Sequence, residues 1–443
     1  MVEAFDPLPQ ITIVVPTHNR RDLMIQMLDA LERQGADTPP FELIAVADGC
    51  RDGTATMLAA HPATFPIRVI ELPGNGPAHA RNAGAAASRA DLLLFLDDDV
   101  LPLPGAVAAH WRAHRDQPGG AVVGPYPPAP HASEDIFRLR IRGWWTRHFA
   151  ALASPGHRFG FRDLLTGNLS MSRALWDRVG GLDPQFARAR EDLELGARLI
   201  AHGVAIRYAP DAFGWHHEHA TSSLASACRR AFEEGRSDAR MLLKHPHLHG
   251  ALDIARSAER RRRRLARFIL TDRRATFLER LTPIARGALS LCRTLHFDTA
   301  YDRLFAQLHR YLYHRGAVAG VDGRWWKLAS IARPDPAVPL VLDLGEGIEH
   351  VEQSITAARP AAVRLLFNGA ELGMLPEQAG AEPWHGRHLR PALVERHGPA
   401  LLETLFGEHL SHGHRPQGWQ HYGVRDFHAQ HMEFRRQWGR AGV

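Results

Sequence analysis

One stretch constrains the fold more than any other. Residues 92–96 (LLLFL) are five consecutive apolar residues, and they run directly into Asp97, Asp98 and Asp99. An unbroken apolar run of this length is typical of a strand buried on both faces of an α/β sheet. The three aspartates would then lie at the carboxyl end of the strand, the edge where open α/β sheets bind ligands. Carboxylates there suit a hard divalent cation that also contacts phosphate, although a merely solvated strand end is the alternative interpretation.

Strands and helices alternate before this stretch. Apolar runs at residues 11–15, 41–47 and 67–71 predict strands, and amphipathic segments between them predict helices. This order predicts a parallel sheet covered by helices on both faces. A glycine-rich turn at 74–76 leads into an alanine-rich helix that carries Arg81, and a helix start with an arginine favours an anion such as a diphosphate.

Four ordered blocks carry a resemblance to a known family. They are VVPTHNR (14–20), ADGCRDGT (47–54), GPAHARNAG (76–84) and DDD (97–99). Together they resemble the inverting family 2 glycosyltransferases of the GT-A fold. Three later features that the family also carries are present: Gly167 with Asn168, GGLDP at 180–184, and Glu191 with Asp192. The resemblance implies an α/β domain of the GT-A fold, with a Rossmann-like mixed sheet.

The resemblance also implies which residues bind the donor. The set is Pro16, Thr17, Asn19, Asp48, Arg81, Asp97 and Asp98. Within it, Asp48 would contact the base, where a carboxylate can accept a hydrogen bond from a uracil imide, and Arg81 would face the diphosphate. We therefore expect a nucleotide-diphosphate sugar as donor, with UDP as the default nucleotide and GDP and dTDP as alternatives.

Metal binding and catalysis are implied by the same comparison. Asp97 and Asp99 match the Asp-x-Asp motif that holds Mn²⁺ or Mg²⁺ against the diphosphate, and either His216 or His217 would complete the metal shell.

Asp192 is the expected general base for the acceptor hydroxyl, with Glu191 as the alternative base. Acids in the first turn of a helix also complement its dipole, which is the purely structural interpretation of this pair. The implied reaction is hexosyl or glycosyl transfer with inversion. A nucleotidyltransferase and a non-catalytic sugar-nucleotide-binding scaffold are the alternative functions.

Length and composition set the remaining expectations. A chain of 443 residues predicts two or three domains. We expect a GT-A domain at 1–244, an arginine-rich helical segment at 245–332, and, after a proline-rich linker, a small α/β module of unknown function at 338–443. Three widely spaced cysteines and an N-terminus without a basic start predict a cytoplasmic protein.

The arginine-rich segment has two interpretations. Residues 260–264, from Arg260 to Arg264, are all arginine, and they could form a solvated helix face or contact an anionic membrane surface peripherally. Nucleic-acid binding is not expected, because neither an aromatic-rich nor a helix-turn-helix pattern accompanies them. The acceptor stays open among a saccharide, a lipid-linked sugar, a peptide and a small molecule.

Overall fold

The computed structural model describes residues 8–130, 136–186, 188–218, 223–255, 272–324 and 326–397. The run from Arg260 to Arg264 therefore lies outside the described residues. The chain divides into two compact units, Met1–Leu152 with Phe159–Pro334, and Ala153–Arg158 with Asp335–Val443. In this division the segment expected at 245–332 groups with the N-terminal domain. The division into the three predicted domains stays a prediction.

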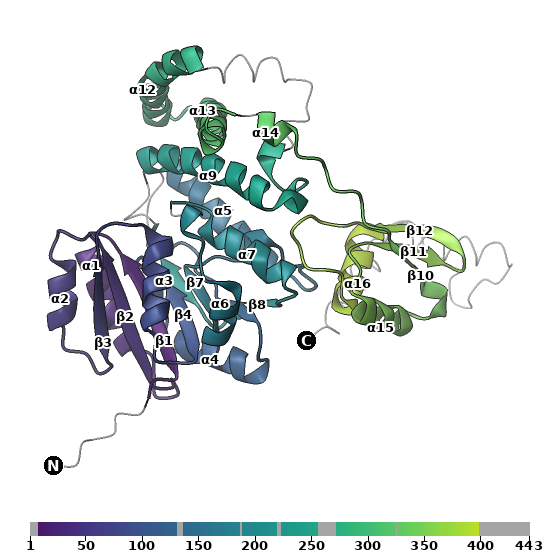
Figure 1. The fold of residues 1–443 in the computed structure, drawn as a ribbon, viewed down its shortest axis with the longest axis horizontal. Coiled ribbons are helices and arrows are strands. Elements are labelled where there is room, and N and C mark those ends of the chain that lie inside the picture. The colour runs from purple at the N-terminus through teal and green to yellow at the C-terminus, as the bar shows by residue number, and fades with distance from the viewer. Residues whose placement is uncertain are drawn as a thin grey trace, which may run out of the picture. The chain divides into compact units, whose positions relative to one another are not determined.

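A seven-stranded mixed sheet lies at the centre of the first unit (Figure 1), in the order β3-β2-β1-β4-β7-β6-β8. Its strands are β1 (Ile11–Thr17), β2 (Phe41–Asp48), β3 (Ile67–Leu72), β4 (Leu92–Leu96), β6 (Ala121–Val123), β7 (Asn168–Ser172) and β8 (Ile206–Tyr208). The strands predicted at 11–15, 41–47, 67–71 and 92–96 are confirmed. β7 runs antiparallel to both its neighbours, and the other pairs are parallel, so the mixed sheet is confirmed as well.

Helices cover both faces of the sheet. On one face α1 (Arg21–Glu32) buries Met24 and Leu28 against Ile13. On the other face α3 (Pro77–Ala87) packs on β1 and β2 so closely that a Cβ on Gly84 would lie 2.4 Å from Val14 Cγ1. The remaining helices around the sheet are α2 (Thr54–Ala60), α4 (Ala106–Asp116), α5 (Ile136–Leu152), α6 (Arg173–Val179) and α7 (Glu191–Ala201), with 3₁₀ turns η1 (Phe161–Asp163) and η2 (Pro184–Phe186).

A short antiparallel ribbon joins the region after β4 to a distant part of the chain. It consists of β5 (Val100–Pro102) and β9 (Gly214–His216), with Val100 paired to His216. Because Asp99 precedes β5 directly, the ribbon brings the third aspartate of the acidic run beside the histidines. Sequence periodicity did not predict either strand, since three residues are too few to show an alternation.

Long helices complete the first unit. They are α9 (Leu224–Lys244), α12 (Asp272–Thr294) and α13 (Asp298–Gly320), followed by the short α14 (Trp326–Ala329), with the 3₁₀ turn η3 (Pro246–Leu248) after α9. α9 and α13 lie side by side (Figure 1), and their backbones nearly touch, because a Cβ on Gly235 would lie 1.8 Å from the carbonyl oxygen of Tyr313. Among the described residues, no helix is long and apolar enough to cross a bilayer.

The second unit has a small sheet of its own. The unit contains β10 (Leu340–Asp343), β11 (Val363–Phe367) and β12 (Ala370–Leu375), helices α15 (Ile348–Ala358) and α16 (Leu389–Ala392), 3₁₀ turns η4 (Leu344–Glu346) and η5 (Gly386–His388), and the π-helical turn η6 (Leu393–His397). β10 and β11 are parallel, and β12 is antiparallel to β11. Arg158 belongs to this unit, where its guanidinium stacks 4.4 Å from the Trp384 ring.

Candidate active site

The first group of predicted site residues ties the end of β1 to the acidic run after β4. These strands are adjacent and parallel, so their carboxyl ends meet, and the Thr17 hydroxyl donates to Asp98 Oδ2 at 2.8 Å. The Arg20 guanidinium lies 3.4 Å from Asp98 and 3.2 Å from Asp99. Burial raises the pKa of Asp98, and the charge of Arg20 opposes that rise. Arg20 thus supplies positive charge that sequence reasoning did not assign, although it stands in the first quoted block.

The second group places one aspartate opposite one histidine. His216 Nε2 lies 3.6 Å from Asp99 Oδ1, and the backbone N–H of His217 donates to the Asp99 carbonyl at 2.7 Å. His216 Nδ1 is buried and has no hydrogen-bond partner among the described residues. An aspartate oxygen and an imidazole nitrogen facing each other fit two positions of a Mn²⁺ or Mg²⁺ shell. No three His, Cys, Asp or Glu residues of the described ranges converge as a metal-binding group.

A third group surrounds Arg81. Its guanidinium donates to Asp97 Oδ1 and, at 3.3 Å, to Glu191 Oε1, and the residue is 4% exposed. Its Nε–H has no partner within the described part of the chain. Arg81 therefore links the end of β4 to the start of α7, and the metal-ligand role predicted for Asp97 stays a prediction. The predicted contact of Arg81 with a diphosphate stays a prediction.

The two candidate bases open α7, as predicted. Asp192 Oδ1 accepts the N–H of Leu193 at 2.8 Å, and Glu191 is buried against Arg81. Burial raises the pKa of both carboxyls, and for Glu191 the neighbouring charge of Asp192 adds to the rise. A carboxylate with a raised pKa is a stronger base than an exposed one, which suits proton transfer from a hydroxyl.

Tyr126 lies among these acids, and sequence reasoning missed it. Its ring is buried, and its pKa is raised by burial and by the charges of Asp97 and Asp192. A Cβ on Gly167 would come within 2.8 Å of the Tyr126 hydroxyl oxygen and 2.9 Å of Asp97 Oδ2. The glycine of the Gly167–Asn168 pair is thus required for close packing. No local pattern marks Tyr126, because it stands alone in a proline-rich segment.

Aromatic rings line the histidine side of the site. Tyr126 and Trp145 contact the His216 ring edge-on, with ring centroids 5.6 and 5.1 Å away. Trp145 comes from α5, and Trp144 beside it is 49% exposed and stacked on His148. His216 is therefore held by neighbouring rings rather than displayed on an open surface turn.

Asp48 and Asn19 shape turns at the same sheet edge. The Asp48 carboxylate accepts the backbone N–H groups of Gly74, Asn75 and Gly76 at 3.0, 2.8 and 2.6 Å, which fixes the turn before α3. Asn19 has φ +53°, and its Oδ1 accepts the N–H of Arg51 at 2.7 Å. The base contact predicted for Asp48, and the pocket roles predicted for Pro16 and Asn19, stay predictions.

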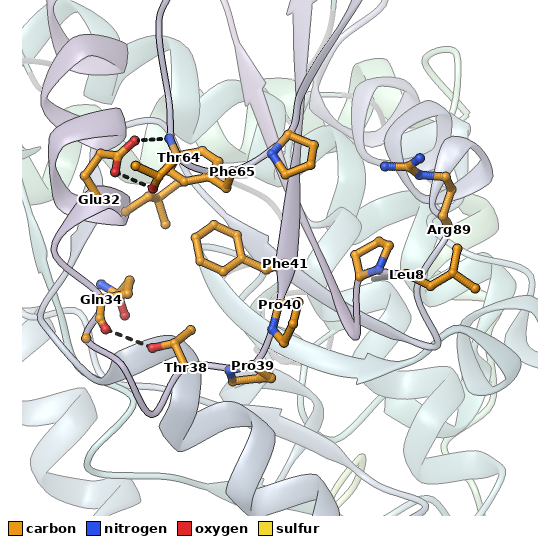
Figure 2. Close-up of a pocket in the computed structure, with 14 residues that line it drawn as sticks. Leu8, Glu32, Gln34, Thr38, Pro39, Pro40, Phe41, Thr64, Phe65 and Arg89 are labelled. Carbon is orange, nitrogen blue, oxygen red and sulfur yellow. Dashed lines mark hydrogen bonds between the residues drawn. The ribbon is translucent and has the colours of Figure 1, made fainter. Parts of the chain in front are cut away.

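A pocket of about 350 Å³ lies at the opposite end of the same strands (Figure 2). Phe41, Phe65 and Pro40 line it, and Glu32 accepts hydrogen bonds from Thr64 at its rim. Phe41 begins β2 and Asp48 ends it, so at about 3.3 Å per residue the pocket lies roughly 23 Å from the acidic edge. None of the predicted site residues lines it.

Comparison with known proteins gives a family match for part of the chain. Residues 12–177 match the model of the family described as "Glycosyl transferase family 2". The validoxylamine A glucosyltransferase of Streptomyces hygroscopicus subsp. jinggangensis is 30% identical over 279 residues, which are 56% of this chain and 64% of that protein. The probable glycosyltransferase YdaM of Bacillus subtilis is 27% identical over 235 residues, 49% of this chain and 53% of that protein.

A solved structure is similar at a lower level. It is the mannosyltransferase PcManGT of Pyrobaculum calidifontis in complex with GDP-Man and Mn²⁺. The two sequences are 21% identical, the match covers 72% of this chain and 89% of that chain, and the TM-score is 0.44. The chain spans 64% and 59% of the length of two curated validoxylamine A glucosyltransferases. The segment 12–177, which carries most of the mixed sheet and the acidic edge described above, thus matches glycosyl transferase family 2, and its mixed α/β sheet is of the GT-A type.

Proposed function

We propose that this protein is a glycosyltransferase that moves a sugar from a nucleotide-diphosphate donor, UDP-linked by default, to an acceptor hydroxyl with inversion. The family 2 domain at 12–177 supports the reaction class. One observation carries the assignment of the site. Arg81 bridges Asp97, on the expected donor side, to Glu191, on the expected acceptor side, which supports a transfer site at this sheet edge.

Asp192 is the proposed general base. It would take the proton of the acceptor hydroxyl while the oxygen attacks the anomeric carbon and the bond to the diphosphate breaks on the opposite face. One such displacement inverts the anomeric centre. The raised pKa of Asp192 supports this role, because a base gains efficiency as its pKa approaches the working pH. Glu191 is the weaker candidate, since Arg81 already engages its carboxylate.

Asp99 and His216 are the residues that would hold a divalent cation, because their donor atoms face each other. Such a cation, when bound, would supply positive charge toward the diphosphate. Arg20 lies beside Asp99, and Arg81 lies beside Asp97, so the chain also offers two cations of its own at this edge. His216 faces Asp99 with a ring nitrogen, whereas the contact of His217 with Asp99 described above is through its backbone N–H, so His216 is the first ligand candidate to test.

The acceptor class is proposed from a relative. The similar Streptomyces protein is named for glucosyl transfer to validoxylamine A, so a small-molecule hydroxyl acceptor and a glucose donor are the first to test. Saccharide, lipid-linked and peptide acceptors are the other outcomes. The exposed Trp144 on α5, next to the ring that contacts His216, offers an apolar face for a ring-shaped acceptor.

The test measures nucleoside diphosphate release from UDP-, GDP- and dTDP-glucose with Mn²⁺ or Mg²⁺, with and without validoxylamine A. We expect acceptor-dependent release with one nucleotide, an inverted anomeric signal in the NMR spectrum of the product, and at least 100-fold less activity in Asp192→Asn. Asp177→Asn removes a surface carboxylate on α6 and should act like wild type. Release that is unchanged in Asp192→Asn, or a retained configuration, would contradict the proposed mechanism.

A further inference from the structure

Arg190, directly before the two candidate bases, forms ion pairs with residues of α9. It stands at the start of α7 with φ +69°, in the left-handed region, which is unfavourable by about 1–2 kcal/mol for a residue with a side chain. Its side chain does not cap the helix. Instead the guanidinium reaches α9, where Nε lies 3.1 Å from Asp238 Oδ1 and Nη2 lies 3.5 Å from Glu234 Oε2. Contacts outside α7 therefore hold the backbone that presents Asp192.

Asp238 is itself held from a third helix. The Tyr313 hydroxyl of α13 donates to Asp238 Oδ2 at 2.7 Å, so each carboxylate oxygen has one partner. The Asp238 side chain is 2% exposed, and Tyr313 is buried. Hydrogen bonds to a buried, ionised group are among the stronger ones in proteins. These contacts form one continuous series from α13 through α9 to α7, which we name the Arg190–Asp238–Tyr313 chain.

The helix crossing fixes the position of Tyr313. A Cβ on Gly235 would lie 1.8 Å from the Tyr313 carbonyl oxygen, and a Cβ on Gly316 would lie 1.8 Å from the Phe232 carbonyl oxygen. The two helices can approach this closely only with glycine at both positions. Because the backbones meet there, Tyr313 cannot shift relative to Asp238 without separating the helices.

The charges around Asp192 show what this arrangement controls. Arg190, Arg81 and Arg230 act on Asp192 from α7, α3 and α9, and Glu191 and Tyr126 are its other titratable neighbours. Asp238 and Glu234 pair with Arg190 from α9, and His309 lies 4.0 Å from Glu234. Without Asp238, the guanidinium would have Asp192 as a competing partner, and a base engaged in a salt bridge is a poorer proton acceptor.

We infer that Asp238 and Tyr313, on helices beyond the segment matched by the family model, are positioning residues for the reaction, because they keep Arg190 from closing a salt bridge with Asp192. This inference rests on the proposed role of Asp192 as general base. It extends the functional site to α9 and α13, so this helix pair is part of the transferase and not an appendage to it.

The test compares Asp238→Asn, Tyr313→Phe and Arg190→Met with wild type, using UDP-glucose and validoxylamine A as substrates. Asp238→Asn should lower kcat by about 10- to 100-fold, part of what a positioned base contributes, with an unchanged KM for UDP-glucose. Tyr313→Phe should have a smaller effect in the same direction. Glu233→Gln on the same helix changes a peripheral pair with Arg236 and should leave kcat unchanged.

The pH profile separates positioning from mere folding. In Asp238→Asn the freed Arg190 stabilises ionised Asp192, so the acidic limb of kcat moves to lower pH. In Arg190→Met the cation is gone, so the limb moves to higher pH. Damage to packing alone would not move the limb in opposite directions. Thermal unfolding of each variant, with the milder Tyr313→Phe as a reference, identifies proteins that fail to fold.

Two failures are distinguishable. If wild type releases no diphosphate from any donor, the proposed function fails, and ¹³C NMR titration of the Asp192 carboxyl in the same variants still tests the inference, because it needs no turnover. Opposite shifts of that carboxyl in Asp238→Asn and Arg190→Met would support the inference. If the Asp192 titration coincides in wild type and both variants, Arg190 is not held away from Asp192 by Asp238, and the inference is overturned.

Discussion

Replacing Arg81 by methionine should destabilise the protein, and more so at pH 8 than at pH 6. The Arg81 side chain is 5% exposed and lies 3.3 Å from Glu191, whose side chain is 12% exposed. Methionine preserves part of the packing but leaves Glu191 buried without its cation. Breaking a buried pair in this way is destabilising by about 3–5 kcal/mol. The lost contact with Asp97 should add less to the destabilisation, because the Asp97 side chain is one-third exposed and water can take the place of the guanidinium.

The pH dependence follows from the titration of Glu191. Burial raises its pKa from 4.5 to about 7, so ionisation of Glu191 already weakens the folded state of wild type as the pH rises through this range. Without Arg81 the pKa rises further, and the folded variant keeps the proton at pH 8 while the unfolded chain has lost it. From pH 6 to pH 8, the free energy of unfolding of the variant therefore falls by about 1.4 kcal/mol more than that of wild type.

Urea unfolding at pH 6 and pH 8 measures this difference. The double variant Arg81→Met/Glu191→Gln should recover most of the loss at pH 8, because glutamine does not titrate and folding no longer requires a proton at this position. Arg112→Met is the matched control, since its partner Asp37 is 66% exposed and the pair should contribute no more than about 1 kcal/mol at either pH. Equal losses at the two pH values, or no recovery in the double variant, would refute the reasoning.

Three further outcomes are expected. Asp48→Asn replaces one of the two oxygens that hold the turn at 74–76, so it should lower the free energy of unfolding by about 1–3 kcal/mol and weaken nucleotide binding. Urea unfolding and calorimetry would measure these two effects. Unchanged binding would argue against a role of this turn in the site. Gly84→Ala should destabilise by about 1–3 kcal/mol in thermal unfolding, since its Cβ would meet Val14, and Val14→Ala should restore part of that loss. The kcat of wild type should fall as the pH is lowered through the raised pKa of Asp192, above the ordinary value of 3.8, and a limb at 3.8 would contradict the effect of burial.

The sequence predicted those parts of the fold that depend on local pattern. The strand at 92–96 and its neighbours have long apolar runs, and α7 has both acids in its first turn and a helical apolar repeat. The antiparallel direction of β7 was not predictable, because direction depends on the connection and not on the strand itself. The three-residue strands β5 and β9 show no period at all.

The site was predictable only where motifs carry its residues. Asp97, Asp99, Glu191 and Asp192 stand in recognisable blocks, but the pairing of Asp97 with Arg81 depends on side-chain directions. The contact between Arg190 and Asp238 joins residues 48 positions apart, and no periodicity encodes it. Partners brought together by tertiary packing alone leave no mark in the neighbouring sequence.

The ribbon of β5 and β9 limits how the loops around it can be redesigned. Its two strands are three residues long, and successive side chains of a strand point to opposite faces. If a loop graft shifted β9 by a single position, His216 would turn away from Asp99, and Trp215 would take its place. Such a protein could still fold around the large sheet. A screen for expression or stability would pass it, whereas a screen for the proposed metal site would reject it.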